Sequence, residues 1–482
     1  MKLIELLEKT KVISGTADLN IEISDIVYDS RQVSAGDVFV AIEGFETDGH
    51  KYISQAVSKG AVAVVCQHKP EESVPYVLVE DSRKALASMA AGYFGNPSER
   101  MKIIGVTGTN GKTTSTILLK QVLEKCKGAK VGLIGTNENM IGHAKIQTEH
   151  TTPESYDLQK LFGEMADSGC EYVVMEVSSH SLVLSRVHDV QFEIGMFTNL
   201  SQDHLDFHGD MEAYAKAKVM LFSQCNNAVI NLDDEHGKMM MDSAKCPVTT
   251  YAIDNNDADI VAKGVKLKSD RVVFSALEVG EIERAEIRIP GRFSAYNALG
   301  VIACARLMGI SLSDATQALA SARGVMGRVE VVETGKPYTV IIDYAHTPDA
   351  LENVLSAAKG FAPGRVVVLF GCGGDRDAKK RPIMGEIAAR VADFVIVTSD
   401  NPRTENPGEI ISDILEGMKE YPDSYTVIED RRQAIAYALD NALPDDIIIL
   451  AGKGHETYQI IGKMKYHMDE REIVMDHLSS GQ

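Results

Sequence analysis

The sequence predicts an α/β protein of three domains, the central one a parallel sheet with a phosphate-binding loop and the last a doubly wound, Rossmann-like sheet. Three observations support this fold class. The chain has 482 residues, enough for about three domains that each bury a core. Runs of β-branched residues recur and are separated by segments of helical length. Residues 102–114 also read as strand, glycine loop and helix.

Residues 1–98 form the first predicted domain, a small α/β unit. Its start resembles an amphipathic helix, and residues 96–98 resemble a linker. We expect strands at residues 37–42, 61–65 and 76–79, and helices near residues 50–59 and 82–94. Polar clusters at residues 29–31 and 44–50 are typical of turns, and their role stays open at this point.

Residues 99–330 form the predicted central domain, organised by a glycine loop. Backbone N–H groups of such a loop converge on phosphate oxygens, Lys112 reaches the β- and γ-phosphates, and Thr113 offers a hydroxyl to Mg²⁺. The usual pattern has glycine where Val106 stands, and Gly105 comes one residue early. We therefore predict a variant P-loop that binds a nucleoside triphosphate; the alternative is a plain glycine turn with a surface lysine.

Polar residues follow the other predicted strands of this domain. These strands are expected at residues 131–134, 171–177, 194–198 and 228–232. Glu176 ends one strand, and residues 199–208, with His204, follow another. Open α/β sheets bind ligands at this edge, and Mg²⁺ prefers oxygen ligands, so Glu176 is a better candidate than a histidine. A structural histidine is the alternative for His204.

Three features close the central domain. Residues 258–289 alternate apolar and polar side chains, which predicts an antiparallel appendix. Residues 291–298 open a long apolar helix. Arg328 lies on a glycine-rich loop at the boundary to the next domain, where it either reaches phosphates or remains an exposed loop arginine.

Residues 331–482 form the predicted last domain, in which strand and helix alternate again. Strands are expected at residues 339–342, 365–370, 394–397, 425–428 and 446–450. Four of them end in polar clusters, at residues 343–349, 371–377, 400–403 and 452–456. A helix cap at Thr347 and a glycine turn at residues 373–374 are simpler interpretations of two clusters. Four clusters at strand ends together predict an active cleft.

Composition excludes several classes of protein. With 49 basic and 69 acidic residues the net charge is −20, which disfavours nonspecific binding to nucleic acid or to anionic membranes. Seven cysteines without a Cys-x-x-Cys pair indicate reduced thiols and a cytoplasmic location. No apolar run approaches the length of about 18 residues that a membrane span needs.

Several motifs together resemble the Mur ligases, over essentially the full chain. They lie at residues 108–114, 151–153, 176–180, 203–206, 343–348 and 400–403. The resemblance is strongest to the members that add the third residue of the peptidoglycan stem peptide. It implies that ATP phosphorylates the D-glutamyl carboxylate of UDP-N-acetylmuramoyl-L-alanyl-D-glutamate, and that an amino acid then attacks the acyl phosphate. We expect a monomer.

The resemblance also assigns roles to individual residues. It implies UDP-substrate contacts from Tyr28, Ser30, Phe45, Glu46, Thr47, Thr151, Thr152, Ser178 and Arg186. It implies ATP contacts from Gly108, Thr109, Asn110, Gly111, Lys112, Thr113, Thr114, Asn297 and Arg328. It implies catalytic roles for Lys112, Lys218, His204, Arg328, Asp343 and His346. The implied Mg²⁺ ligands are Thr113, Glu176, His204 and a CO₂-carboxylated Lys218, which from spacing alone is a solvated helix lysine.

The added amino acid is predicted to be meso-diaminopimelate. This substrate has a second carboxylate at its far end, where lysine has a bare ammonium. Arg376 and Arg403 suit bidentate carboxylate recognition and would repel that ammonium. The Asp400-Asn401-Pro402-Arg403 segment resembles the diaminopimelate-type signature, and Gly452 and Glu456 match positions for the other end of the amino acid.

Other functions remain open from the sequence. A lysine-adding ligase of the same family is the nearest alternative. A P-loop GTPase or motor ATPase belongs to another class, but no Asn-Lys-x-Asp guanine signature is present. A folate-polyglutamate-type ligase would share the phosphate loop without the first domain or residues 400–403. A non-catalytic binding module would leave the phosphate loop without a purpose.

Overall fold

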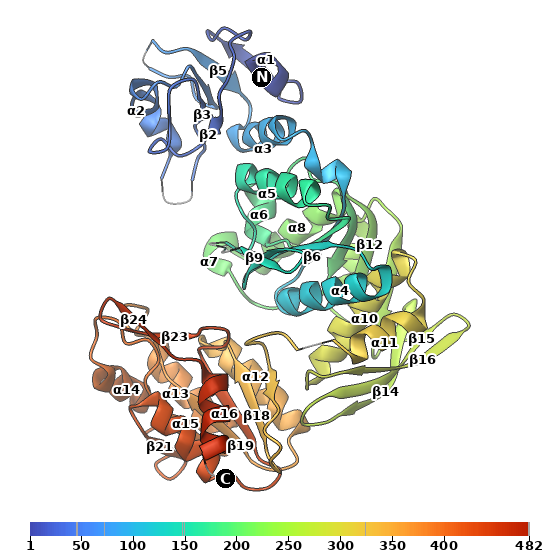
Figure 1. The fold of residues 1–482 in the computed structure, drawn as a ribbon, viewed down its shortest axis with the longest axis vertical. Helices are drawn as coiled ribbons and strands as arrows, with labels where there is room; N and C mark the ends of the chain where they lie inside the picture. The colour runs from blue at the N-terminus through green and yellow to red at the C-terminus, as the bar shows by residue number, and fades with distance from the viewer. Residues whose placement is uncertain (45–46, 72, 147, 149, 323, 481–482) are drawn as a thin grey trace. The chain divides into compact units, whose positions relative to one another are not determined.

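The computed structural model describes residues 1–44, 47–71, 73–146, 148, 150–322 and 324–480. The chain divides into two compact units. The first contains residues 1–251, 257–259 and 303–310, and the second contains residues 252–256, 260–302 and 311–482. Figure 1 traces the chain from the blue N-terminus to the red C-terminus, with helices lying against sheets in both units.

The N-terminal sheet of the first unit has the strand order β1-β5-β4-β3-β2. Its strands are β1 (Val12–Gly15), β2 (Ile26–Val27), β3 (Val38–Val40), β4 (Ala63–Cys66) and β5 (Tyr76–Val79). Alternate strand residues point to opposite faces, so α1 (Leu3–Leu6) and α3 (Ser82–Tyr93) pack on one face and α2 (Ile53–Ser58) on the other. The sequence did not predict β1 and β2, because β1 is exposed throughout and β2 has two residues.

The second sheet of the first unit contains parallel strands in the order β13-β12-β11-β6-β10-β7. They are β6 (Lys102–Thr107), β7 (Val131–Ile134), β10 (Tyr172–Glu176), β11 (Phe192–Phe197), β12 (Cys225–Asn231) and β13 (Val248–Ala252). An unpredicted hairpin, β8 (Asn139–Ile141) and β9 (Ala144–Ile146), extends the β7 edge. Strand order reverses between β6 and β11, so the loops that follow these strands meet at a topological switch point.

Helices cover both faces of this parallel sheet (Figure 1). They are α4 (Lys112–Lys127), α5 (Ser155–Asp167), α6 (Ser179–Val183), α7 (Leu205–His208), α8 (Met211–Val219) and α9 (Gly237–Ser243). Ile103 and Val173 share a core with α5 and α8. The alternate residue Ile104 points to the opposite face, where α4 packs on β6, β7 and β10.

The second unit begins with the predicted antiparallel ribbon. Its strands β14 (Ile260–Leu267), β15 (Val272–Glu278) and β16 (Glu281–Ile287) pair in sequence order. Two helices follow. They are α10 (Arg292–Leu307), of which residues 303–307 belong to the first unit, and α11 (Leu312–Ala320), which packs on β16. The alternating pattern of residues 258–289 therefore predicted the ribbon correctly.

The other sheet of the second unit is doubly wound, with the order β17-β18-β22-β19-β20-β21. Its strands are β17 (Glu330–Val332), β18 (Thr339–Asp343), β19 (Val366–Phe370), β20 (Phe394–Val397), β21 (Tyr425–Val427) and β22 (Ile447–Ala451). β17 is antiparallel to β18, and the remaining pairs are parallel.

Helices pack on both faces of this sheet as well. One face carries α12 (Pro348–Phe361), α13 (Lys380–Val391) and α14 (Pro407–Glu416), and the other carries α15 (Arg431–Asp440) and α16 (Glu470–Ser480). A hairpin of β23 (Tyr458–Ile461) and β24 (Met464–His467) follows β22. The predicted α/β class, with a central parallel sheet and a doubly wound C-terminal sheet, is confirmed.

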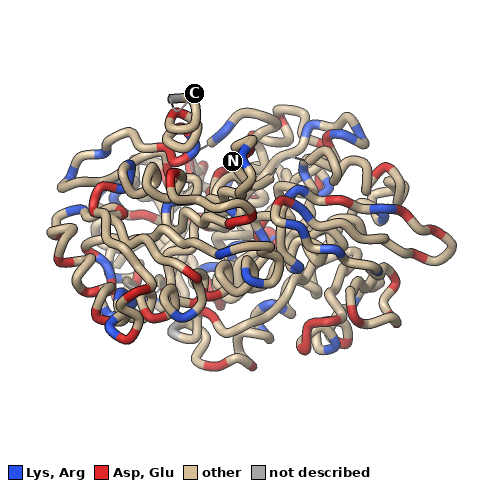
Figure 2. The backbone as a smooth tube through the Cα atoms, turned by 90° about the horizontal axis from the view of Figure 1, so that it is seen from below, with Lys and Arg blue, Asp and Glu red and all other residues tan. Residues whose placement is uncertain are grey.

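Charged residues of both signs are interspersed along the backbone (Figure 2). The excess of acidic residues, which gives the net charge of −20, is thus spread over the chain. Among the helices that the structure describes, none is both long and apolar enough to span a bilayer.

Candidate active site

The glycine loop joins the end of β6 to the start of α4, as the sequence predicted. Gly111 caps α4 in the left-handed conformation, with φ of 86°. Lys112 Nζ donates hydrogen bonds to the carbonyl oxygens of Gly108 and Thr109, both at 2.8 Å. The lysine ammonium therefore lies beside the glycine loop at the N-terminus of a 16-residue helix, an arrangement that favours anionic oxygens.

The departure from the usual loop pattern has a packing explanation. Val106 lies within β6, opposite Glu176 of β10, and is completely buried. A Cβ atom on Gly105 would lie 2.8 Å from the Phe192 ring. Gly105 is therefore a glycine because of sheet packing, and it lies outside the loop of residues 108–111.

The loop after β11 holds the glycine loop in place through hydrogen bonds. The sequence did not indicate this contact. Thr198 Oγ1 donates to the carbonyl of Asn110 at 2.7 Å, and Asn199 Oδ1 accepts from the Asn110 amide at 2.9 Å. A side chain on Gly108 would overlap Thr198 Oγ1. The switch point between β6 and β11 was the available signal, since it places these two loops side by side.

Several predicted substrate residues gather around the end of β10. Thr152 Oγ1 donates to the Glu176 carbonyl at 2.9 Å and accepts from the Ser178 amide at 3.2 Å. Arg186 donates to the Thr152 carbonyl at 3.0 Å. Thr151 hydrogen-bonds Thr136, so the structure brings Thr151, Thr152, Ser178 and Arg186 together.

Glu176 is held in one orientation at this edge. Its side chain accepts hydrogen bonds from the Thr136 amide at 2.9 Å and from the Thr136 hydroxyl at 3.1 Å. The residue is almost completely buried, which makes an unpaired carboxylate costly. The sequence did not indicate Thr136 as its partner.

Lys218 is a buried amine without a hydrogen-bonded partner among the described residues. It lies on α8 with 1% of its surface exposed, and its Nζ is 4.3 Å from the centre of the Tyr214 ring. Burial and then the nearby Lys112 lower the pKa of the Lys218 amine well below its usual value. A neutral amine is nucleophilic and therefore able to react with CO₂.

The histidines of this region form an aromatic cluster. His204 is exposed, has a left-handed φ of 52°, and packs edge-on against His180 at 4.8 Å between ring centres. Within the part of the chain that the structure describes, no three His, Cys, Asp or Glu side chains converge to hold a metal ion. Of the four expected Mg²⁺ ligands, only Glu176 and His204 are residues of these kinds. The other two are the Thr113 hydroxyl and Lys218.

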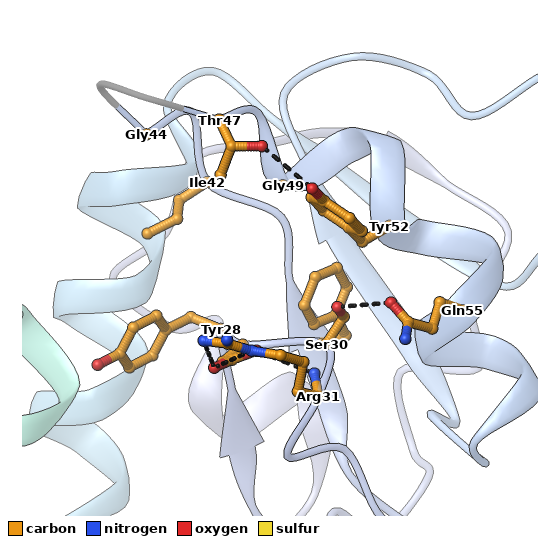
Figure 3. Close-up of a pocket in the computed structure, with 11 residues that line it drawn as sticks. Tyr28, Ser30, Arg31, Ile42, Gly44, Thr47, Gly49, Tyr52 and Gln55 are labelled. Carbon is orange, nitrogen blue, oxygen red and sulfur yellow. Dashed lines mark hydrogen bonds and ion pairs between the residues drawn. The ribbon is translucent and has the colours of Figure 1, made fainter.

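The N-terminal sheet carries a cavity of about 550 Å³ (Figure 3). Tyr28, Ser30 and Thr47, three of the five UDP-site residues expected there, line it. Phe45 and Glu46 lie outside the described residues. Figure 3 shows Tyr28 and the Arg31 side chain on one side of the open space and Tyr52 and Thr47 on the other. Aromatic walls with polar groups suit a planar, polar ligand.

In the second unit, Arg328 and Asp343 lie close together. The Asp343 carboxylate accepts hydrogen bonds from the amides of Val329 at 2.8 Å and Ala345 at 2.9 Å. Burial raises the pKa of Asp343, and these bonds and Arg328 oppose that shift. Arg328 lies over the Tyr344 ring, and its buried Nε has no hydrogen-bond partner among the described residues. Such a donor is available to an anionic ligand.

The remaining two residues of the expected nucleotide site differ in exposure. His346 is exposed, and its ring Nδ1 lies 2.8 Å from the Tyr344 carbonyl. Asn297 is buried within α10.

The loops after β19, β20 and β22 meet around the predicted amino-acid site. Arg403 Nη1 donates to the Gly374 carbonyl at 2.8 Å, and the exposed Arg376 follows two residues later on that loop. Gly452 must be a glycine, since its φ is 110° and a Cβ atom would lie 2.7 Å from Asp400 Oδ2. Asn401 donates to Glu456 at 2.9 Å. Pro402 is buried beside them.

Comparisons with known proteins cover nearly the whole chain. Residues 22–94 match the Mur ligase family, catalytic domain; residues 106–305 match the Mur ligase middle domain; and residues 327–454 match the Mur ligase, glutamate ligase domain.

Relatives and a solved structure agree with these matches. A UDP-N-acetylmuramoyl-L-alanyl-D-glutamate--2,6-diaminopimelate ligase of Caldanaerobacter subterraneus subsp. tengcongensis is 51% identical over 486 residues, covering 100% of both chains. A protein of that name, numbered 1, from Clostridium acetobutylicum is 48% identical, covering 99% of both. A solved structure bearing the same enzyme name is 30% identical, with a TM-score of 0.75, and the match covers 100% of this chain and 99% of the other.

Proposed function

Because the chain belongs to the Mur ligase family, we propose that it adds meso-diaminopimelate to UDP-N-acetylmuramoyl-L-alanyl-D-glutamate during peptidoglycan precursor synthesis. The observation that carries this proposal is full-length identity of about half to relatives bearing that enzyme name. The reaction is an ATP-dependent amide ligation that releases ADP and phosphate. A sugar-nucleotide substrate and seven free cysteines support a cytoplasmic location.

The first step activates a carboxylate. The glycine loop, residues 108–114, holds the triphosphate, and the Lys112 ammonium neutralises charge on the γ-phosphoryl group as it moves to the D-glutamyl side chain. Arg328, with its unpartnered Nε, is a second donor for phosphate oxygens. The product of this step is an acyl phosphate, which reacts readily with an amine.

Mg²⁺ would be held by the Thr113 hydroxyl, by Glu176 and His204, and by Lys218 after carboxylation. The donors fit a hard cation, because they are mainly oxygens once Lys218 carries CO₂. Among the described residues, Lys218 also has no hydrogen-bonded carboxylate that would compete. The ion supplies charge neutralisation at the phosphates when bound. Thr136 keeps Glu176 in place through two hydrogen bonds.

The other residues divide the substrates between them. The 550 Å³ cavity receives the UDP group, and Thr151, Thr152, Ser178 and Arg186 hold the sugar and peptide. We assign these tasks to a first domain of residues 1–98 and a central domain of residues 99–330. Residues 331–482 form the amino-acid domain, with Arg376 and Arg403 on the distal carboxylate, Asp400 and Asn401 as further contacts, and Gly452 and Glu456 at the other end of the amino acid.

The test measures ADP release by the purified chain with ATP, Mg²⁺ and the UDP-linked dipeptide. We expect release only when meso-diaminopimelate is added, together with a product whose mass has increased by one diaminopimelyl residue. Faster release with L-lysine would replace the proposal by the lysine-adding ligase. ADP release that needs no amino acid would instead indicate an NTPase switch.

A further inference from the structure

Lys453 is a fully buried cation among the amino-acid-binding loops. It follows β22 and has 0% of its surface exposed. Its Nζ donates hydrogen bonds to Asn401 Oδ1 at 3.2 Å and to Glu456 Oε2 at 3.1 Å. A buried charge is costly unless it is paired and hydrogen-bonded, so this lysine fixes the groups that surround it.

These bonds determine how Asn401 is oriented. Its Oδ1 accepts from Lys453 and also from the Ile460 amide at 2.9 Å, while its Nδ2 donates to Glu456 Oε2 at 2.9 Å. With both donors on one side, the side-chain amide has a single satisfied orientation. The loops after β20 and β22 and strand β23 are joined in this way.

The same bonds leave Glu456 with one oxygen for a ligand. Oε2 is occupied by Lys453 and Asn401, and Oε1 has no hydrogen-bond partner among the described residues. The Glu456 side chain is 14% exposed. One oxygen is thus held from within, and the other is available to a donor that enters from outside.

We propose that Lys453 is a positioning residue that aims Glu456 at the end of the amino-acid substrate opposite its distal carboxylate. The proposal rests on the proposed function and deepens it. Lys453 is too buried to touch the substrate, so it acts through Glu456 and Asn401.

The test replaces Lys453 by methionine, which has a similar length and no charge. We expect KM for meso-diaminopimelate to rise by about 10- to 100-fold, the effect of losing a hydrogen bond to a charged group. KM for ATP and for the UDP-linked dipeptide should stay within about twofold. Lys465→Met is the matched control, because Lys465 is an exposed lysine of β24 whose ammonium lies over the Tyr458 ring. The KM values of the Lys465→Met variant should not change.

A double-mutant cycle separates positioning from bulk stability. If Lys453 acts through Glu456, then Lys453→Met should add little to the KM of a Glu456→Gln variant. Equal losses for all three substrates, with additive effects in the cycle, would overturn the proposal and leave a structural lysine.

A second variant covers the case in which Lys453→Met does not fold. Lys453→Arg keeps the charge but moves the donors, and it should raise only the KM for diaminopimelate; an unchanged KM in a folded Lys453→Arg variant would then overturn the proposal. Failure of the proposed function is distinguishable, because the unsubstituted chain would not use diaminopimelate at all.

Discussion

Replacing Arg403 by alanine tests how the amino acid is selected. One edge of the guanidinium is occupied, since Nη1 donates to the Gly374 carbonyl. Among the described residues nothing accepts from Nε or Nη2, so the opposite edge remains for a carboxylate. Two parallel charge-assisted bonds would contribute about 1.5–3 kcal/mol each. Because Arg403 is only partly buried, we reduce the total to about 2–4 kcal/mol, or about 30- to 1,000-fold in kcat/KM.

The assay for Arg403→Ala follows ADP release at varied concentrations of meso-diaminopimelate and of lysine. We expect a large loss for diaminopimelate and a smaller one for lysine, which lacks the distal carboxylate. Arg390→Ala, an exposed arginine of α13 paired with Glu352 and Glu386, is the control and should keep full activity. Unchanged kcat/KM for diaminopimelate in Arg403→Ala would refute this account of selectivity.

Three further predictions concern the loop, the core and alkaline pH. Gly108→Ala should reduce kcat/KM for ATP by about 100-fold or more, because the new methyl group overlaps Thr198 Oγ1. An unchanged kcat/KM for ATP would show that the loop tolerates the side chain. Arg431→Met should lower the free energy of unfolding by about 3–5 kcal/mol, since the Glu470 carboxylate, 2.8 Å from the Arg431 guanidinium, then stays buried without a cation. Unfolding in denaturant measures this loss. The double variant Arg431→Met, Glu470→Leu should recover much of it. Burial raises the pKa of Tyr214 to about 12, above its usual value near 10. Between pH 10 and 12 the folded state therefore keeps a proton that the unfolded state releases, so this contribution to stability is present below pH 10 and is lost as pH rises toward 12. In Tyr214→Phe the free energy of unfolding should fall less steeply over that range. A pH profile identical to that of the unsubstituted chain would contradict the assignment.

Most strands could be predicted because their apolar runs are buried on both faces. The predicted segments 131–134 and 394–397 coincide with β7 and β20 residue for residue. The strands β1, β23 and β24 were missed, since β1 and β24 are exposed, β23 is only partly buried, and none has a long continuous apolar run. Exposed edges and hairpins depend on neighbours that are distant in sequence.

The candidate site was predictable where backbone chemistry demands a residue type. Gly108, Gly111 and Gly452 hold positive φ angles or close approaches, and such positions are visible as glycines in a sequence. Lys453 was not singled out, because a lysine at a strand end is usually solvated, and only the folded chain shows its burial. Thr136 and Asn199 were missed for a similar reason, as their partners come from other strands.

The central claim is that ATP at the glycine loop activates the D-glutamyl carboxylate as an acyl phosphate. The most direct measurement uses a UDP-linked dipeptide in which both oxygens of the glutamyl side-chain carboxylate are a heavy isotope. We predict that mass spectrometry will find one heavy oxygen in the released phosphate for each amide formed, and none with a Lys112→Met variant, which should form no product. Released phosphate without heavy oxygen, alongside normal product formation, would contradict the account.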